Sequence, residues 1–75
     1  MRFLAAVVQL NSTSDEEASL DQTEALVRQA ARDGATFIAT PENTNYLGPH
    51  DDKVRRAQSL DGPVCHRFSS LAHEL

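Results

Sequence analysis

The 75-residue sequence predicts an α/β fold with the order strand, helix, strand, helix. Two apolar runs, over residues 3–10 and 35–40, are nearly continuous rather than alternating, which is typical of strands buried on both faces of a parallel sheet. Two further stretches, about residues 15–33 and 63–75, carry apolar residues at helical spacing. A helix that links two such strands normally crosses between parallel strands of one sheet. A chain of this length holds at most one small domain.

The first helix has recognisable signals at both ends. Ser14 followed by Glu17 fits a capping box, in which each side chain satisfies a free backbone amide, and Gly34 supplies the stop. Glu24 and Arg28 form an i,i+4 pair on one face. The face expected to pack on the sheet consists of Leu20, Thr23, Val27, Ala30, Ala31 and Gly34.

The second strand should end at Pro41, which biases the residue before it towards an extended backbone. Residues 43–52 contain Asn, Gly and Pro and predict a loop, with a short helix over about 52–59. The last helix opens with Asp61-Gly62-Pro63. Its apolar face comprises Val64, Phe68, Leu71, Ala72 and Leu75. Its other face carries His66, Ser69, Ser70 and His73.

Composition limits the classes of partner. Apolar residues make up 40% of the sequence and charged residues 24%, which is ordinary for a globular protein. The net charge of −4 argues against nucleic acid, because neutralising phosphates needs a basic patch. No segment approaches the roughly 20 apolar residues of a membrane span. The single cysteine, Cys65, excludes an internal disulfide and a Cys-based metal cluster. We therefore expect a cytoplasmic protein with no nucleic-acid or membrane partner.

Glu42 stands directly behind the second strand, after Pro41. In open α/β sheets, ligands bind beyond the carboxyl ends of the parallel strands. A carboxylate partly removed from water at this place suits a general base near neutral pH. Position alone favours a solvated loop acid over a catalytic one.

Four features, in this order, resemble the N-terminal part of the nitrilase superfamily, the carbon–nitrogen hydrolases. They are the first strand AAVVQL, a helix ending in AARDGA, the strand TFIATPEN and the second helix LDGPVCHRFSSLAHEL. Together they run from Phe3 to Leu75. The resemblance implies that residues 1–75 are the N-terminal strand-helix-strand-helix portion of an α-β-β-α sandwich hydrolase domain, with the rest of that domain absent.

The resemblance also implies a mechanism. Glu42 would be the general base of a Glu-Lys-Cys triad that hydrolyses a small-molecule amide or nitrile without a cofactor or metal. The glutamate takes the thiol proton, the thiolate attacks the carbon, and the lysine stabilises the oxyanion. In the family that lysine and cysteine lie further downstream, so this chain would be a fragment or a truncated product, inactive alone. The complete protein would be a homo-oligomer.

Lys53 and Cys65 are the only lysine and the only cysteine, yet they are not read as members of the triad. Lys53 lies in the polar stretch HDDKVRR and is expected to be a surface charge. Cys65 lies beside the apolar face of the last helix and is expected to be a half-buried packing residue. His66 and His73 are about 10 Å apart along a helix, too far to share one metal ion. His50 is expected in a solvated loop.

Asn43 and Tyr46 follow the candidate base and are candidates to line a substrate pocket, because such loops often carry function. Turn chemistry accounts for Asn43 equally well. A different class of function also stays open: a non-catalytic α/β interaction module, or a truncated product, that folds only with a partner, because the core is small. A dinucleotide-binding domain is discounted because the segment QLNSTSDEE after the first strand has no glycine.

Overall fold

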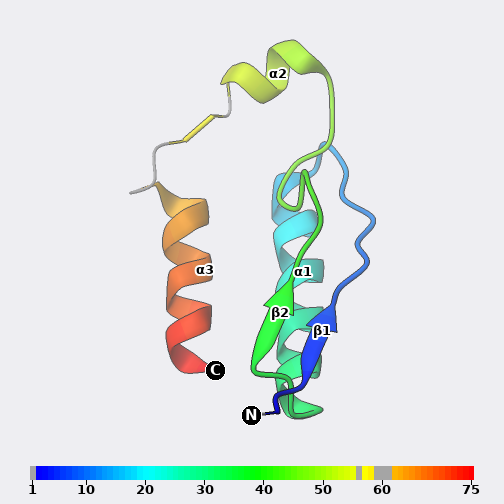
Figure 1. Ribbon diagram of the computed structural model, residues 1–75. Helices are drawn as coiled ribbons and strands as arrows, with labels where there is room; N and C mark the ends of the chain where they lie inside the picture. Colours follow the sequence, from blue (N-terminus) through cyan, green and yellow to red (C-terminus); the bar gives the residue numbers. More distant parts are fainter. Residues whose placement is uncertain (1, 56, 59–61) are drawn as a thin grey trace.

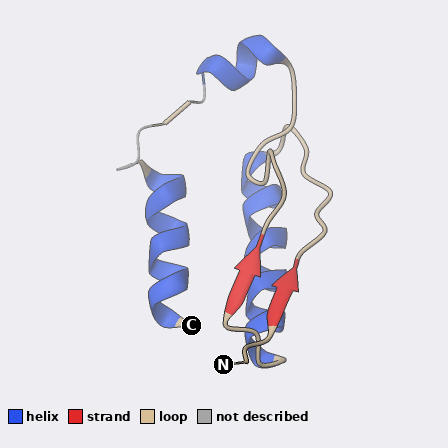
Figure 2. Ribbon diagram, in the orientation of Figure 1, coloured by secondary structure: helices blue, strands red, loops and turns tan. Residues whose placement is uncertain are grey.

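The computed structural model describes residues 2–55, 57–58 and 62–75. Two three-residue strands form a parallel sheet in which Ala6 lies opposite Ile38. A long helix connects these strands, and another helix runs alongside it (Figure 1, Figure 2). The predicted order of elements and the parallel pairing are confirmed. The elements are β1 (Ala5–Val7), α1 (Glu16–Arg32), β2 (Phe37–Ala39), α2 (His50–Arg55) and α3 (Pro63–Glu74).

The predicted helix boundaries agree with α1 and α3 to within one residue, while the short helix is displaced. This helix was expected over 52–59, whereas α2 spans His50–Arg55 and so begins two residues earlier. His50 therefore begins a helix and does not lie in a loop. Residues 56 and 59 of the expected range, and Asp61 of the predicted start of the last helix, lie outside the described residues.

The sheet is covered on one face only, contrary to the expectation of burial on both. Val8 on the helix side is 7% exposed, whereas Val7, Phe3 and Phe37 are 88%, 67% and 61% exposed. Successive side chains of a strand point to opposite faces, and among the described residues α1 and α3 cover one face. Both strands are also shorter than predicted. The uncovered face is apolar and lacks a packing partner within the described chain.

Helix α1 begins one residue later than the capping box predicts. Its N-cap is Asp15, whose side chain accepts a hydrogen bond from the Ala18 amide at 3.1 Å. This is the usual way in which an N-cap carboxylate satisfies a free amide of the first turn. Gly34 ends the helix as predicted, with φ of 100° and its amide donating to the Ala31 carbonyl at 3.0 Å.

A small core lies between the helices and the sheet. Thr23 is fully buried, and its hydroxyl donates to the Ser19 carbonyl at 2.8 Å, which satisfies its polar atom within the helix. Leu71 is the buried residue of α3, and it faces a groove of about 450 Å³ between α3, α1 and β2. The buried apolar residues are Val8, Leu20, Tyr46 and Leu71.

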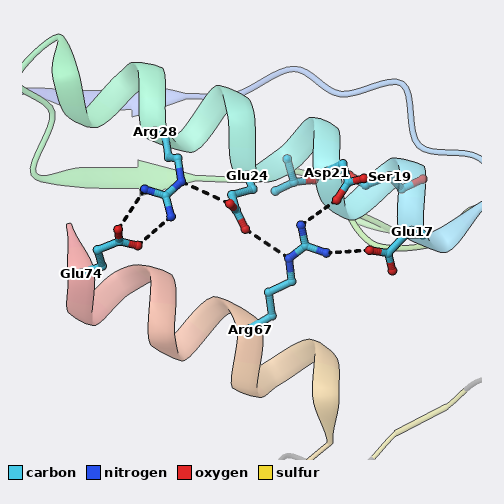
Figure 3. A network of polar contacts seen from close by, with 8 residues as sticks. Glu17, Ser19, Asp21, Glu24, Arg28, Arg67 and Glu74 are labelled. Carbon is cyan, nitrogen blue, oxygen red and sulfur yellow. Dashed lines mark hydrogen bonds and ion pairs between the residues drawn. The ribbon is translucent and has the colours of Figure 1, made fainter.

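Ion pairs connect α1 to α3 (Figure 3). Arg28 binds Glu24 at 3.2 Å, as the i,i+4 spacing predicts, and also Glu74 at 2.6 Å. Arg67 of α3 reaches three carboxylates of α1, namely Glu17 at 3.5 Å, Asp21 at 2.8 Å and Glu24 at 3.3 Å. The pairs are partly exposed, so each contributes little to stability, but together they fix how α3 lies against α1.

The contact with Arg28 sets the protonation of Glu74. Hydrogen bonds from Arg28, and then its charge, lower the pKa of Glu74 below its ordinary value of 4.5. Because the pKa is lower in the folded state than in the unfolded state, the contact stabilises the fold above the ordinary pKa and is lost as the pH falls through the folded value.

We predict that an NMR titration of the Glu74 carboxyl carbon gives a midpoint below 4.5, and that Arg28→Gln returns it towards that value. The control Arg32→Gln, at the end of the same helix, should leave the midpoint unchanged. An unshifted midpoint in the unmodified chain would show that the α1–α3 ion pair does not form in solution.

Candidate active site

Glu42 lies three residues beyond the end of β2, behind Thr40 and Pro41. Because β1 and β2 are parallel, their carboxyl ends meet at one edge of the sheet, and Glu42 lies at this edge. Its side chain is exposed and makes no hydrogen bond or ion pair with the described residues. Both carboxylate oxygens are therefore unoccupied by other parts of the described chain.

Hydrogen bonds hold the loop that carries Glu42 on both sides of this residue. The Thr44 hydroxyl donates to the Pro41 carbonyl, which closes the backbone around Glu42. The Ser12 hydroxyl donates to the Thr44 carbonyl at 2.6 Å, and the Leu47 amide donates to the Thr13 carbonyl at 3.0 Å. The segment after β1 therefore holds the segment after β2.

Asn43, the residue after Glu42, has a left-handed backbone with φ of 58°. Asparagine is one of the few residues other than glycine that adopt this conformation readily. Its side-chain oxygen accepts a hydrogen bond from the Lys53 ammonium of α2 at 2.5 Å. Lys53 is exposed, as predicted for a surface charge, but its ammonium has a defined partner.

Tyr46 anchors the far end of this loop. It is only 3% exposed, and its hydroxyl donates to the Asp52 carboxylate of α2. Gly48 lies against the ring, because a Cβ added there would be 2.6 Å from the Tyr46 hydroxyl and 2.9 Å from Cζ. Glycine is therefore the residue that this packing allows.

A hollow of about 560 Å³ lies between this loop, α2 and α3. The predicted pocket residues Asn43 and Tyr46 both line it, and Lys53 and Cys65 line it with them, whereas Glu42 does not. Glu42, Lys53 and Cys65 therefore do not face one common cavity, which agrees with reading the last two as residues outside a triad. The roles of Asn43 and Tyr46 in binding substrate stay predictions.

Cys65 was expected to be a half-buried packing residue, and this expectation is wrong. The cysteine is exposed on α3, and it borders the open hollow beside Phe68. His66 and His73 are exposed as well. Among the residues that the structure describes, no group of three or more His, Cys, Asp and Glu side chains is placed to hold a metal ion. None of the described helices is both long and apolar enough to cross a membrane.

The chain belongs to the family described as carbon–nitrogen hydrolases, whose pattern matches residues 4–75. It is 33% identical over 72 residues to the deaminated glutathione amidase of Bos taurus, covering 95% of this chain and 22% of that protein. It is 34% identical over 74 residues to the citrullinase of Francisella tularensis, covering 92% of this chain and 26% of that protein. The deaminated glutathione amidase of Synechocystis is 33% identical over 58 residues, covering 77% of this chain and 21% of that protein.

The chain therefore spans between about a fifth and about a quarter of the length of these relatives. No solved structure matches it significantly. The match over nearly the whole chain confirms the family resemblance, and the strand-helix-strand-helix order agrees with the N-terminal part of the α-β-β-α fold.

We predict that Gly48→Ala destabilises the loop, because the added methyl group would overlap the Tyr46 ring. Overpacking of this kind typically costs about 1–3 kcal/mol. The decrease should appear as a lower midpoint of thermal unfolding, measured by circular dichroism. The control Leu47→Ala, at a neighbouring side chain that is 54% exposed, should change the midpoint little. Equal midpoints for Gly48→Ala and the unmodified chain would contradict the packing of Tyr46 against Gly48.

Proposed function

We propose that this chain is the N-terminal portion of a carbon–nitrogen hydrolase domain and that Glu42 is its general base. The observation that carries the proposal is the position of Glu42 behind Pro41 at the carboxyl edge of the parallel sheet, within a segment that matches the family from residue 4 onward. A base in this position can reach into a site built above the sheet edge.

The chemistry requires a base with an available oxygen and a fixed position. Glu42 makes no competing bond with the described residues. The Thr44 hydroxyl holds the Pro41 carbonyl before it, and the Lys53 ammonium holds the Asn43 side chain after it. In a Glu-Lys-Cys triad the carboxylate accepts the proton of the cysteine thiol, and the thiolate then attacks the substrate carbon. A lysine stabilises the oxyanion that forms. The carbon–nitrogen bond then breaks, the nitrogen leaves with a proton as ammonia or an amine, and water hydrolyses the acyl-enzyme to the acid and the free thiol. We place this lysine and this cysteine in a part of the domain outside residues 1–75.

Glu42 is exposed in this chain, whereas a general base works best when it is partly removed from water. The adjoining sheet face, with Val7 and Phe37 exposed, offers the surface on which the remaining domain would pack. Such packing would bury the apolar face and shield the edge where Glu42 lies. The exposed face therefore supports the proposal that residues 1–75 work as one portion of a larger domain.

The names of the relatives favour an amide over a nitrile as the substrate. One similar protein is an amidase for deaminated glutathione and another is a citrullinase. We propose a small-molecule amide for this protein too, hydrolysed without a cofactor or metal. Assembly of the complete protein into a homo-oligomer stays a prediction.

A second candidate function is an interaction module that folds on a partner. The uncovered apolar face of Phe3, Val7 and Phe37 favours partner-dependent folding in this case as well. The two candidates differ in one observation. A module is isolated from cells as a stable 75-residue species with its partner, whereas the hydrolase is isolated as a longer chain that contains Glu42.

We predict that Glu42→Gln in the complete domain lowers kcat at least about a hundredfold, because glutamine keeps the size of the side chain but cannot accept the proton, and general-base catalysis contributes about 10²–10⁴-fold. Glu42→Asp should also lower kcat, since the shorter side chain withdraws the base by about 1 Å, and a misplacement of this size can reduce the rate about 10²-fold. The control Asp51→Asn changes an exposed acid of α2 and should leave kcat unaltered. Near-normal kcat/KM for Glu42→Gln, measured by ammonia release, would identify Glu42 as a loop residue without a catalytic role.

The 75-residue chain alone should release no ammonia from simple amides above background, because the proposed nucleophile and oxyanion lysine are outside it. Cys65→Ser is the matched variant, since it removes the one thiol of the chain. Turnover by the chain that Cys65→Ser abolishes would instead establish Cys65 as a nucleophile.

A further inference from the structure

We propose that Asn43 and Lys53 form a positioning pair that fixes the direction in which Glu42 leaves the sheet edge. The pair joins the residue directly after Glu42 to helix α2 through the hydrogen bond from Lys53 Nζ to Asn43 Oδ1, at 2.5 Å. This inference rests on the proposed function of Glu42. It assigns to Lys53 a role beyond that of a surface charge.

The backbone at Asn43 is the first support for this proposal. With φ of 58°, Asn43 turns the chain sharply immediately after Glu42. Because asparagine adopts the left-handed region at little cost, the backbone alone does not hold φ at this value, and the side-chain bond to Lys53 restrains it. Any relaxation of φ at Asn43 would rotate the peptide that joins it to Glu42 and so change the direction of the carboxylate.

The exposure of Lys53 is the second support. A hydrogen bond made by an exposed lysine contributes little to stability, because water competes for both partners and the long side chain loses rotamer freedom. Lys53 nevertheless holds Asn43 rather than a neighbouring carboxylate. Because this contact contributes little to stability and lies next to the candidate base, we assign it the role of positioning Asn43 and, through it, Glu42.

The other hydrogen bonds of the loop do not involve the Asn43 side chain. Thr44 bonds the Pro41 carbonyl, and Ser12 bonds the Thr44 carbonyl, so both flanks of the Glu42–Asn43 unit are anchored. Between these two anchored flanks, the side chain of Asn43 itself is held by its hydrogen bond from Lys53. Helix α2 is held in turn to the loop by the bond between Tyr46 and Asp52.

The test measures kcat and KM in the complete domain for Asn43→Gly, Lys53→Met and the double variant. Asn43→Gly keeps access to positive φ but removes the side-chain oxygen, and Lys53→Met removes the donor while keeping the length of the side chain. Each should lower kcat about tenfold or more and change KM by a smaller factor, because misplacement of the base acts on the reaction more than on substrate binding. The double variant should lose no more than either single one, since both remove the same contact.

Three controls separate positioning from general damage. Lys53→Arg and Asn43→Asp keep a donor and an acceptor and should retain most of kcat. Asp51→Asn, an exposed change on the same helix, should leave kcat unaltered. Thermal midpoints of all variants should stay close to that of the parent domain, because the contact lies at the surface.

A second readout does not depend on turnover. NMR order parameters of the Glu42 and Asn43 amides should be lower in Lys53→Met than in the parent domain, while those of Thr44 stay unchanged because its bonds to Pro41 and Ser12 remain. Unchanged kcat and unchanged order parameters in Asn43→Gly and Lys53→Met, alongside a Glu42→Gln variant that has lost activity, would overturn the positioning pair alone. Retained activity in Glu42→Gln would overturn the proposed function and this inference together.

Discussion

The parallel pairing of β1 with β2 is the interaction on which the rest of this structure depends. Strands that run in one direction end at one edge, so the segments that follow them leave the sheet side by side. The hydrogen bonds from Ser12 to Thr44 and from Leu47 to Thr13 are possible for this reason. Glu42 emerges at that same edge, and α1 supplies the connection that a parallel pair requires. The position of the candidate base is therefore a consequence of strand direction.

The same pairing leaves an incomplete core. One face of the sheet packs on helices, and the other presents Val7 and Phe37 to solvent. Helix α3 adds the buried Leu71 and is otherwise held to α1 by the ion pairs of Arg28 and Arg67 (Figure 3). Domains of this size bury a smaller share of their surface on folding than larger domains do. The relatives are about four times longer than this chain, and we propose that the apolar face is an interior surface of a larger domain.

The sequence predicted the parts of this fold that depend on local pattern. Helical spacing located α1 and α3, Pro41 marked the end of β2, and Gly34 marked the end of α1. The features that the sequence did not predict are contacts between residues that lie far apart along the chain. The Arg28–Glu74 pair joins residues 46 positions apart, which no local spacing reveals. The bond between Lys53 and Asn43 depends on how α2 folds back over the loop. The predicted burial of both sheet faces failed because it assumed a neighbouring layer that the described chain does not contain.

The most direct test of the central claim is a crystal structure of the complete domain with an unreactive amide bound. If Glu42 is the base, one of its carboxylate oxygens lies within hydrogen-bond reach of the nucleophilic thiol, about 2.6–3.2 Å or through one water. The sheet face that carries Val7 and Phe37 is then buried by the rest of the domain. A structure in which Glu42 points into bulk solvent, with a different acid beside the thiol, would contradict the claim that the sheet edge presents Glu42 to the reaction.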